Sequence, residues 1–360
     1  MIKQLAVEGV TVFAERSVFQ FAPGVNVIVG GNDSGKSHLM KLCYAMAKWA
    51  VRSPKGELPE AWAEEQRLRR ILLRVFGTRD LSSLASRGGD GAARVRASLA
   101  GEKAPWGTCE TGWSFSPARE AEGLHLDVLP QRYLTENTVY LPPRDVLAIY
   151  PCYVQAGKRY PELLDAAAWE LCCALDTEGE PPAEGPLRHA LQCAEQLLGG
   201  RLCRSNGRFY LERAGRGKLE LNLAAEGYKR TGTLGLLLQN STVRRGTVLF
   251  ADEPETNLNA RHLPLLVRLL LSSARGGVQV FLTTHSLFLL RELVIQLAEK
   301  NNARLSRRFI GLEPPESTGG SSVSQGETLS AIGPIASLQA EMEQADRYLS
   351  LNPGEPPAYE

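Results

Sequence analysis

The eight residues from Gly30 to Ser37 have the types and spacing of a loop that binds phosphate groups. Their sequence, GGNDSGKS, fits the pattern G-x-x-x-x-G-K-[ST], in which glycines allow backbone N–H groups to surround a polyphosphate at the start of a helix. The ammonium of Lys36 would neutralise the β and γ phosphates of ATP, and the hydroxyl of Ser37 would hold Mg²⁺. We therefore predict an ATP-binding segment that consists of Gly30, Asn32, Asp33, Ser34, Gly35, Lys36, Ser37 and His38.

Three further polar side chains follow apolar stretches much later in the chain. Asp252 and Glu253 follow VLFA and precede a proline, and His285 ends the stretch VFLTTH. Asp252 would bind Mg²⁺ through water, Glu253 would polarise the attacking water, and His285 would contact the γ phosphate. Taken alone, an acidic pair is more often a solvated loop or a helix cap, and such a histidine is more often an ordinary residue at a strand end. The phosphate loop favours the catalytic interpretation.

Buried strands are expected to position these groups. Residues 2–13 and 17–29 alternate apolar and polar positions and then become apolar throughout, and a helical pattern follows at 37–51,. The stretches 247–253 and 278–285 are apolar strands on either side of a helix, which predicts a βαβ unit with parallel strands. Such a unit places both polar strand ends at one edge of the sheet.

The rest of the chain contains weaker patterns. Residues 53–135 change in character, and we interpret them as an insertion,. The elements expected there and beyond are helices near 61–76 and 92–100, short strands in 106–117, a strand at 137–142, an αα pair at 161–175 and 186–199, a hairpin within 201–223, a helix at 227–239, an alternating tail, and a short helix near 336–349,.

The segments GGNDSGKS, VLFADEPETNLN and VFLTTHS together resemble the ATPase heads of ABC proteins, of SMC-like repair proteins and of the OLD-like AAA-family ATPases of bacterial defence operons. The resemblance implies an α/β P-loop NTPase fold of the ABC-type head, in which a helical insertion replaces a long coiled coil. It implies ATP and Mg²⁺ as cofactors and ATP hydrolysis, slow or regulated, as the reaction.

The resemblance also suggests a division of the chain. The expected parts are 1–52, the N-terminal part of the head; 53–135, the insertion; 136–206, a strand like that of the glutamine loop with a helical arm; 207–312, the C-terminal part of the head; and 313–360, a hairpin strand, a helix and a flexible tail.

Related heads carry a glycine-containing signature that reaches the γ phosphate of the opposite subunit. The matching stretch here is 225–230, AEGYKR, which lacks the usual serine. Gly227 with Lys229 or Arg230 would supply N–H groups and positive charge, and residues 255–259 would lie across a dimer interface. The resemblance therefore implies a head-to-head homodimer or a higher homo-oligomer.

Two arginine-containing segments have alternative interpretations. Arg144 in LPPRDVLAIYP resembles the stretch before the arm of OLD-like ATPases and could bind phosphate or a carboxylate, although a surface arginine is favoured,. The arginines of 67–96 could contact nucleic acid, although a solvated helical face with ion pairs is favoured. These residues are Arg67, Arg69, Arg70, Arg74, Arg79, Arg87, Arg94 and Arg96.

Composition sets the remaining limits. The chain has 41 Lys plus Arg against 40 Asp plus Glu, so its net charge does not attract nucleic acid or anionic membrane. No apolar run approaches the ~18 residues of a membrane span, and the seven cysteines lie mostly in apolar helical patterns,. We expect a cytoplasmic protein with reduced cysteines and no membrane partner.

These observations favour a nucleotide-dependent switch. By analogy with the family, we expect it to act in a bacterial anti-phage defence complex and to control a separate effector, a toxin or nuclease encoded nearby. The alternative is a RecF-type DNA repair ATPase that binds DNA through the arginine-rich insertion. A transporter subunit is disfavoured, because the signature is poor and no glutamine loop of the transporter type is present.

Overall fold

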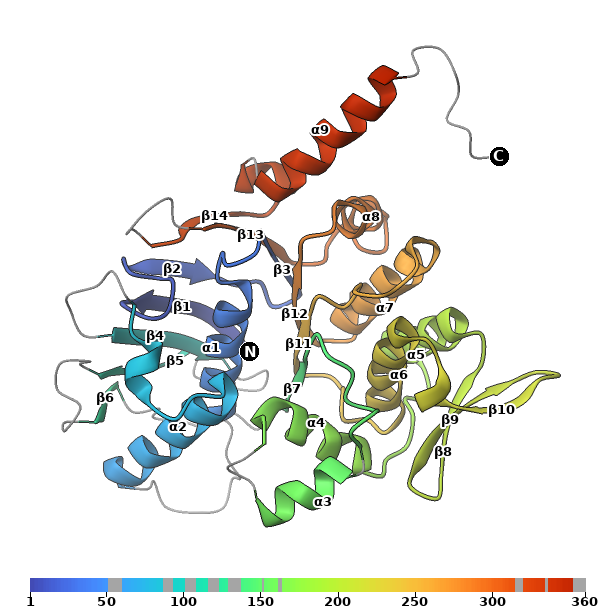
Figure 1. The fold of residues 1–360 in the computed structure, drawn as a ribbon, viewed down its shortest axis with the longest axis horizontal. Coiled ribbons are helices and arrows are strands. Elements are labelled where there is room, and N and C mark those ends of the chain that lie inside the picture. Colours follow the sequence, from blue (N-terminus) through green and yellow to red (C-terminus); the bar gives the residue numbers. More distant parts are fainter. Residues whose placement is uncertain are drawn as a thin grey trace.

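The computed structural model describes residues 1–50, 60–86, 93–100, 108–115, 123–128, 137–150, 152–160, 164–314, 320–333 and 336–351. These residues form a mixed α/β structure with a central sheet, an antiparallel sheet beside it and a three-stranded hairpin sheet at the far side (Figure 1). The prediction of an α/β fold is confirmed.

The central sheet has the order β14-β13-β3-β12-β11-β7. Its strands are β3 (Val25–Gly30), β7 (Thr138–Leu141), β11 (Val248–Asp252), β12 (Gln279–Thr284), β13 (Arg307–Glu313) and β14 (Ser322–Gly326). All neighbours are parallel except β14, which pairs antiparallel with β13. β3, β11 and β12 are buried along their whole length, as expected where helices or a second sheet cover both faces.

The two faces of the central sheet belong to different hydrophobic cores. Successive residues of β3 alternate between them: Val27 and Val29 contribute to one core and Ile28 to the other, because side chains of a strand point to opposite faces in turn. The first core contains α5 (Gly185–Leu198), α6 (Glu226–Gln239), α7 (Leu263–Arg275) and α8 (Leu287–Leu297). The second contains α1 (Lys36–Ala50), α2 (Ala61–Phe76) and the antiparallel sheet. The expected βαβ unit is confirmed as β11, α7 and β12.

The antiparallel sheet corrects one expectation about the insertion. Its order is β2-β1-β4-β5-β6, with β1 (Ile2–Glu8), β2 (Ser17–Gln20), β4 (Ala93–Ala100), β5 (Thr108–Phe115) and β6 (Leu124–Val128). Residues 92–100 were expected to form a helix, and this prediction is wrong, because 93–100 form β4. Val95 and Leu99 are buried whereas Arg94 and Arg96 are exposed, which is the period of two of a strand that pairs with β1,.

The helical region corrects a second expectation. It contains α3 (Cys152–Arg159), α4 (Ala166–Asp176) and the hairpin sheet of β8 (Arg201–Ser205), β9 (Arg208–Arg213) and β10 (Gly217–Glu220). α4 packs mainly on α3 and β7, whereas α5 packs on α6 and α7. The predicted αα pair of α4 with α5 is therefore wrong: each helix covers a different part of the core.

The remaining elements lie at the periphery. α9 (Ala336–Leu351) extends away from the body (Figure 1), and short 3-10 helices span Leu81–Leu84, Leu221–Leu223, Ala260–His262 and Leu329–Ile332. All seven cysteines are free thiols, and none of the described helices is long and apolar enough to cross a bilayer. The start of the predicted strands in 106–117, Arg87 and the predicted flexible tail after 351 lie wholly or partly outside the described residues.

Candidate nucleotide site

The predicted phosphate loop joins the end of β3 to the start of α1. Gly30 must lack a side chain, because a Cβ there would lie 2.3 Å from the carbonyl oxygen of Leu312. Gly35 has a φ of 95° and Asp33 a φ of 58°, values that glycine adopts freely and other residues seldom. Asn32 and Asp33 are exposed, and the buried Ser34 hydroxyl donates to the Gly31 carbonyl at 2.9 Å. The loop therefore curves as a phosphate cradle requires.

Lys36 lies over this loop. Its ammonium donates to the carbonyls of Gly30 at 2.8 Å and Gly31 at 2.7 Å. Burial lowers the pKa of Lys36, and the nearby carboxylates, Glu253 foremost, oppose that shift. The carboxylates favour the charged form of Lys36, and its side chain lies over the loop where a triphosphate would arrive.

Asp252 is a buried carboxylate surrounded by hydroxyl groups. Its Oδ1 accepts from the Thr283 hydroxyl at 2.5 Å and lies 3.4 Å from the Ser37 hydroxyl, and its Oδ2 accepts from the Tyr140 hydroxyl at 2.8 Å. A carboxylate and a hydroxyl are the hard oxygen ligands that suit Mg²⁺. Among the described residues no group of three or more His, Cys, Asp or Glu side chains could hold a metal ion. The Ser37 hydroxyl and the Asp252 carboxylate are the groups that would hold Mg²⁺ at this site,.

Glu253 and His285 meet at the ends of neighbouring strands. Glu253 Oε1 lies 3.0 Å from His285 Nδ1, and both side chains are accessible, with exposures of 25% and 50%. The backbone of Glu253 has a φ of 48°, and its N–H donates to the Thr283 hydroxyl at 2.9 Å. Thr283 thus holds two consecutive acidic residues at once. The carboxylate of Glu253 is available to a water molecule next to the loop.

Two residues of this site were not singled out in the sequence. Thr283 precedes the predicted switch histidine by two positions, and Tyr140 lies in the strand NTVYLP. Neither belongs to a recognisable pattern, since a threonine and a tyrosine are common in strands. Only the parallel register, which pairs Asp252 with Thr283 in β12, could have indicated Thr283.

The signature-like stretch lies at the start of α6 and contacts its own chain. A Cβ on Gly227 would lie 2.4 Å from the carbonyl oxygen of Asn257, so α6 packs closely against the 255–259 segment. The Lys229 ammonium lies 3.0 Å from Glu226 and 3.4 Å from Asp145. Within the chain, Lys229 is therefore paired away from the phosphate loop.

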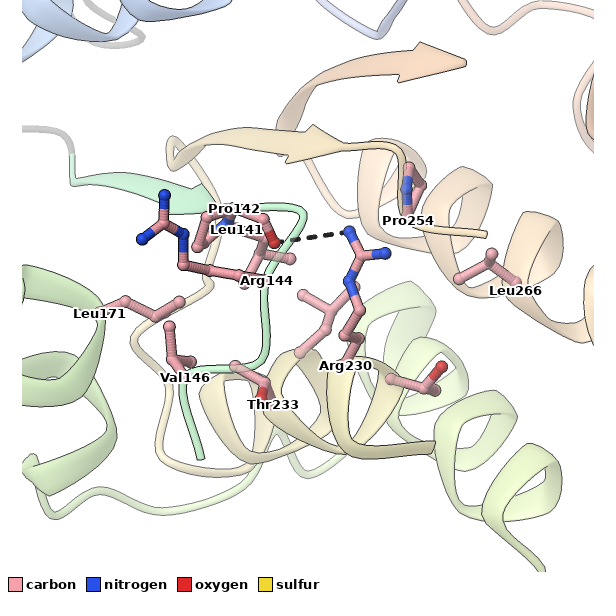
Figure 2. A pocket seen from close by; sticks show the side chains of 11 residues that line it. Leu141, Pro142, Arg144, Val146, Leu171, Arg230, Thr233, Pro254 and Leu266 are labelled. Carbon is pink, nitrogen blue, oxygen red and sulfur yellow. Dashed lines mark hydrogen bonds between the residues drawn. The ribbon is translucent and has the colours of Figure 1, made fainter. Parts of the chain in front are cut away.

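Arg230, the neighbour of Lys229, reaches the site instead. Its Nη2 donates to the carbonyl of Asp252 at 2.6 Å and to that of Pro142 at 3.4 Å. Figure 2 shows the second bond across a narrow, mostly apolar pocket, and the guanidinium of Arg144 points away from Arg230. Arg144 is exposed, which agrees with the favoured surface interpretation.

The last of the predicted loop residues, His38, packs against the insertion. Its ring lies 6.1 Å from that of Phe76 at the end of α2, and burial lowers its pKa. The structure therefore brings together Lys36, Ser37, Asp252, Glu253 and His285, while the side chains of His38 and Lys229 make other contacts.

The arginine-rich segment does not form one solvated helical face. Arg67 bonds to Glu64 and to the Trp49 carbonyl, and Arg74 lies over the Trp169 ring at 5.3 Å. Arg94 and Arg96 are exposed on β4.

Comparison with known proteins places these observations in a family. Residues 50–291 match the family described as "AAA domain, putative AbiEii toxin, Type IV TA system". No curated protein sequence matches the chain.

Solved structures share the fold at low sequence identity. The "SMC head domain from Thermotoga maritima" is 15% identical, with a TM-score of 0.50, over 91% of this chain and 99% of that chain. A structure of "the SmcHead bound to the C-winged helix domain of ScpA" is 16% identical, with a TM-score of 0.57, over 92% and 99%. A third, the Smc head with an extended coiled coil bound to the C-terminal domain of ScpA, derived from Pyrococcus furiosus, is 14% identical, with a TM-score of 0.54, over 96% and 99%.

The family match covers most of the chain and extends through both β11 and β12, and the heads share its α/β architecture. The predicted resemblance to ABC/SMC-like AAA ATPases is thereby confirmed. This chain belongs to the AAA-domain family named above and has the fold of an SMC-type ATPase head.

Proposed function

We propose that the protein binds and hydrolyses Mg-ATP at the site between the phosphate loop and the ends of β11 and β12. The convergence of Lys36, Ser37, Asp252 and Glu253 carries this proposal, because these groups come from distant parts of the chain. Ser37 and Asp252 would hold Mg²⁺, which neutralises charge on the β and γ phosphates. Glu253 would accept a proton from the attacking water, and the loop N–H groups would bind the phosphates.

His285 gives the site a means of reporting the nucleotide state. The Nδ1 atom of its ring lies at hydrogen-bond distance, 3.0 Å, from Oε1 of Glu253. In the sequence, His285 directly precedes Ser286, the N-cap residue of α8. A γ phosphate that accepts a hydrogen bond from the imidazole would compete with Glu253 for the ring. We propose that this exchange transmits ATP binding and hydrolysis to α8 and the outer surface.

A separate effector is the proposed target of this switch. The family description names a putative toxin of a toxin–antitoxin system, and two of the similar heads are bound to a domain of another protein. These descriptions support the proposal of a partner protein. We further propose that the protein is a cytoplasmic, nucleotide-controlled homodimer that acts in bacterial anti-phage defence. We also propose that the five predicted parts of the chain act as functional units, with the insertion 53–135 and the C-terminal part 313–360 as the parts that transmit the state to the partner.

Nucleotide binding is tested with Lys36→Ala. We expect loss of ATP binding in isothermal titration, because the cation that faces the phosphates is removed. Lys41→Ala is the matched control: Lys41 lies on the same helix, but its ammonium packs over the Phe76 ring at 5.7 Å. Unchanged affinity in Lys36→Ala, or equal losses in both variants, would refute the site.

One observation supports the alternative function, a RecF-type ATPase that binds DNA. Arg16, Arg94 and Arg96 line a hollow on the antiparallel sheet together with Glu8, and the two β4 arginines project from one face. Phosphate contacts make DNA binding salt-dependent. Duplex DNA binding that weakens with salt and is lost in Arg94→Glu/Arg96→Glu would favour this function.

A further inference from the structure

An aromatic cluster lies directly beneath the acidic pair. The Tyr140 ring stacks on Phe250 with 6.2 Å between centroids and lies 5.3 Å from the Tyr44 ring. Tyr140 comes from β7, Phe250 from β11 and Tyr44 from α1, so the cluster joins the helix of the phosphate loop to two strands of the sheet. Tyr140 is only 4% exposed, and its ring packing leaves the hydroxyl little freedom to turn elsewhere.

The Tyr140 hydroxyl donates to Oδ2 of Asp252 at 2.8 Å. Asp252 is itself 3% exposed, and a buried carboxylate is stable only where its oxygens accept hydrogen bonds. Thr283 occupies Oδ1, the oxygen that also faces Ser37. The bond from Tyr140 therefore fixes the rotation of the carboxylate and keeps Oδ1 on the side of the phosphate loop.

We propose that Tyr140 is a positioning residue that orients Asp252 for Mg²⁺ binding. The inference rests on the proposed function, because it assigns a partner to the metal ligand of that site. A phenol is a hydrogen-bond donor at neutral pH, so the Tyr140 hydroxyl donates and the Asp252 carboxylate accepts,. Hydrogen bonds of this kind to a metal ligand set its orientation and change metal affinity when they are removed.

Tyr44 provides a matched comparison within the same cluster. Its ring contacts Tyr140 and Phe250, and its hydroxyl donates to Glu170 of α4. Tyr44 is as buried as Tyr140 but bonds to the arm and not to Asp252. Replacing either tyrosine by phenylalanine removes one hydroxyl and preserves the ring contacts.

The experiment measures Mg²⁺ dependence separately from nucleotide binding. ATP affinity is measured by titration calorimetry in EDTA, and the Mg²⁺ concentration for half of the ATP-induced rise in Tm is measured by thermal melting. For Tyr140→Phe we expect unchanged ATP affinity in EDTA and a midpoint raised by about 10-fold or more. For Tyr44→Phe we expect a midpoint like that of the unsubstituted protein. Equal midpoints in the two variants would overturn the proposal.

A double-substitution cycle separates positioning from general destabilisation. In the Asp252→Asn background, Tyr140→Phe should cause no further change in the Mg²⁺ midpoint, because the group that it positions is already altered. A further shift of similar size would show that Tyr140 acts through the fold and would refute the inference. If the unsubstituted protein binds ATP in neither EDTA nor Mg²⁺, the proposed function itself fails, a result distinct from equal midpoints with ATP bound.

Discussion

The acidic residues at the end of β11 have different surroundings although they are close in sequence. Asp252 receives hydrogen bonds on both carboxylate oxygens, and Glu253 is partly exposed beside His285. Glu255 is 9% exposed and accepts a bond from the Thr284 hydroxyl, while its Oε2 has no hydrogen-bond partner among the described residues. These surroundings suit three roles: a metal ligand, a base that meets water, and a buried carboxyl between the site and the 255–259 segment.

The environment of Glu255 predicts a pH-dependent stability. Burial raises its pKa, so the folded state favours the protonated form relative to the unfolded chain. The stability that this group contributes is therefore greatest below the ordinary Glu pKa and is lost as the pH rises through the raised folded pKa. Glu255→Gln, which stays neutral, should have a higher Tm than the unsubstituted protein at about pH 8, and the difference should disappear near pH 4.

Thermal melts of the two proteins across this pH range measure the effect. In Glu255→Gln the side-chain carbonyl of the glutamine can still accept the hydrogen bond from the Thr284 hydroxyl. Thr284→Val removes that hydrogen bond and is therefore the control for its loss; it should lower Tm at every pH. A Tm difference for Glu255→Gln that does not change with pH would contradict the assignment.

At the scale of elements, the two faces of β4 differ in burial, so substitutions on them should change the free energy of unfolding by different amounts. Leu99 is 1% exposed in the core beneath the antiparallel sheet, and Leu99→Ala should lower the free energy of unfolding by about 2–5 kcal/mol. Arg96 is on the opposite, exposed face, and Arg96→Ala should change it by no more than about 0.5 kcal/mol. Urea denaturation measures both values, and similar effects of the two substitutions would contradict the strand.

The same strand is an example of structure that could not be predicted from local sequence. The strand–loop–helix around Gly30, the βαβ unit of 247–285 and helix 227–239 were predictable, because long apolar runs and glycine spacing depend on local sequence,. Residues 93–100 were mistaken for a helix because Ala, Arg and Leu favour helices in isolation. Pairing with β1, far away in the chain, decides their conformation.

The candidate site divides in the same way. Lys36, Ser37, Asp252, Glu253 and His285 were identifiable, since each belongs to a motif with a mechanism. The side chains that hold them were not, because a hydroxyl such as that of Tyr140 gains its role from the order of the strands in the sheet. Sequence shows which groups could react, and topology shows which groups support them.

At the scale of the whole molecule, polar contacts join α1, the helix that follows the phosphate loop, to α4 of the helical arm. Glu170 of α4 accepts from the Tyr44 hydroxyl and lies 2.9 Å from the Lys48 ammonium, and both partners belong to α1. The central sheet separates two cores, and Arg230 bonds the start of α6 to the end of β11. A movement of α1 or of the end of β11 would therefore also move α4 of the arm and the start of α6.

This connection predicts that nucleotide controls association of two heads. Gly227 packs against Asn257, whose φ is 62°, and the segment 255–259 lies beside the acidic pair that would meet ATP. Glu253→Gln retains Lys36, Ser37 and Asp252 but removes the base, so ATP should bind and persist. We expect this variant to form a long-lived dimer in Mg-ATP and to remain monomeric without nucleotide.

Light scattering coupled to size-exclusion chromatography measures the mass in each state. Glu253→Gln combined with Lys36→Ala should remain monomeric in Mg-ATP, because closure requires bound triphosphate and not merely the loss of a carboxylate charge. A dimer in that double variant would attribute association to the charge change. A monomer in Glu253→Gln, with ATP shown by calorimetry to be bound, would refute head closure and leave nucleotide binding intact.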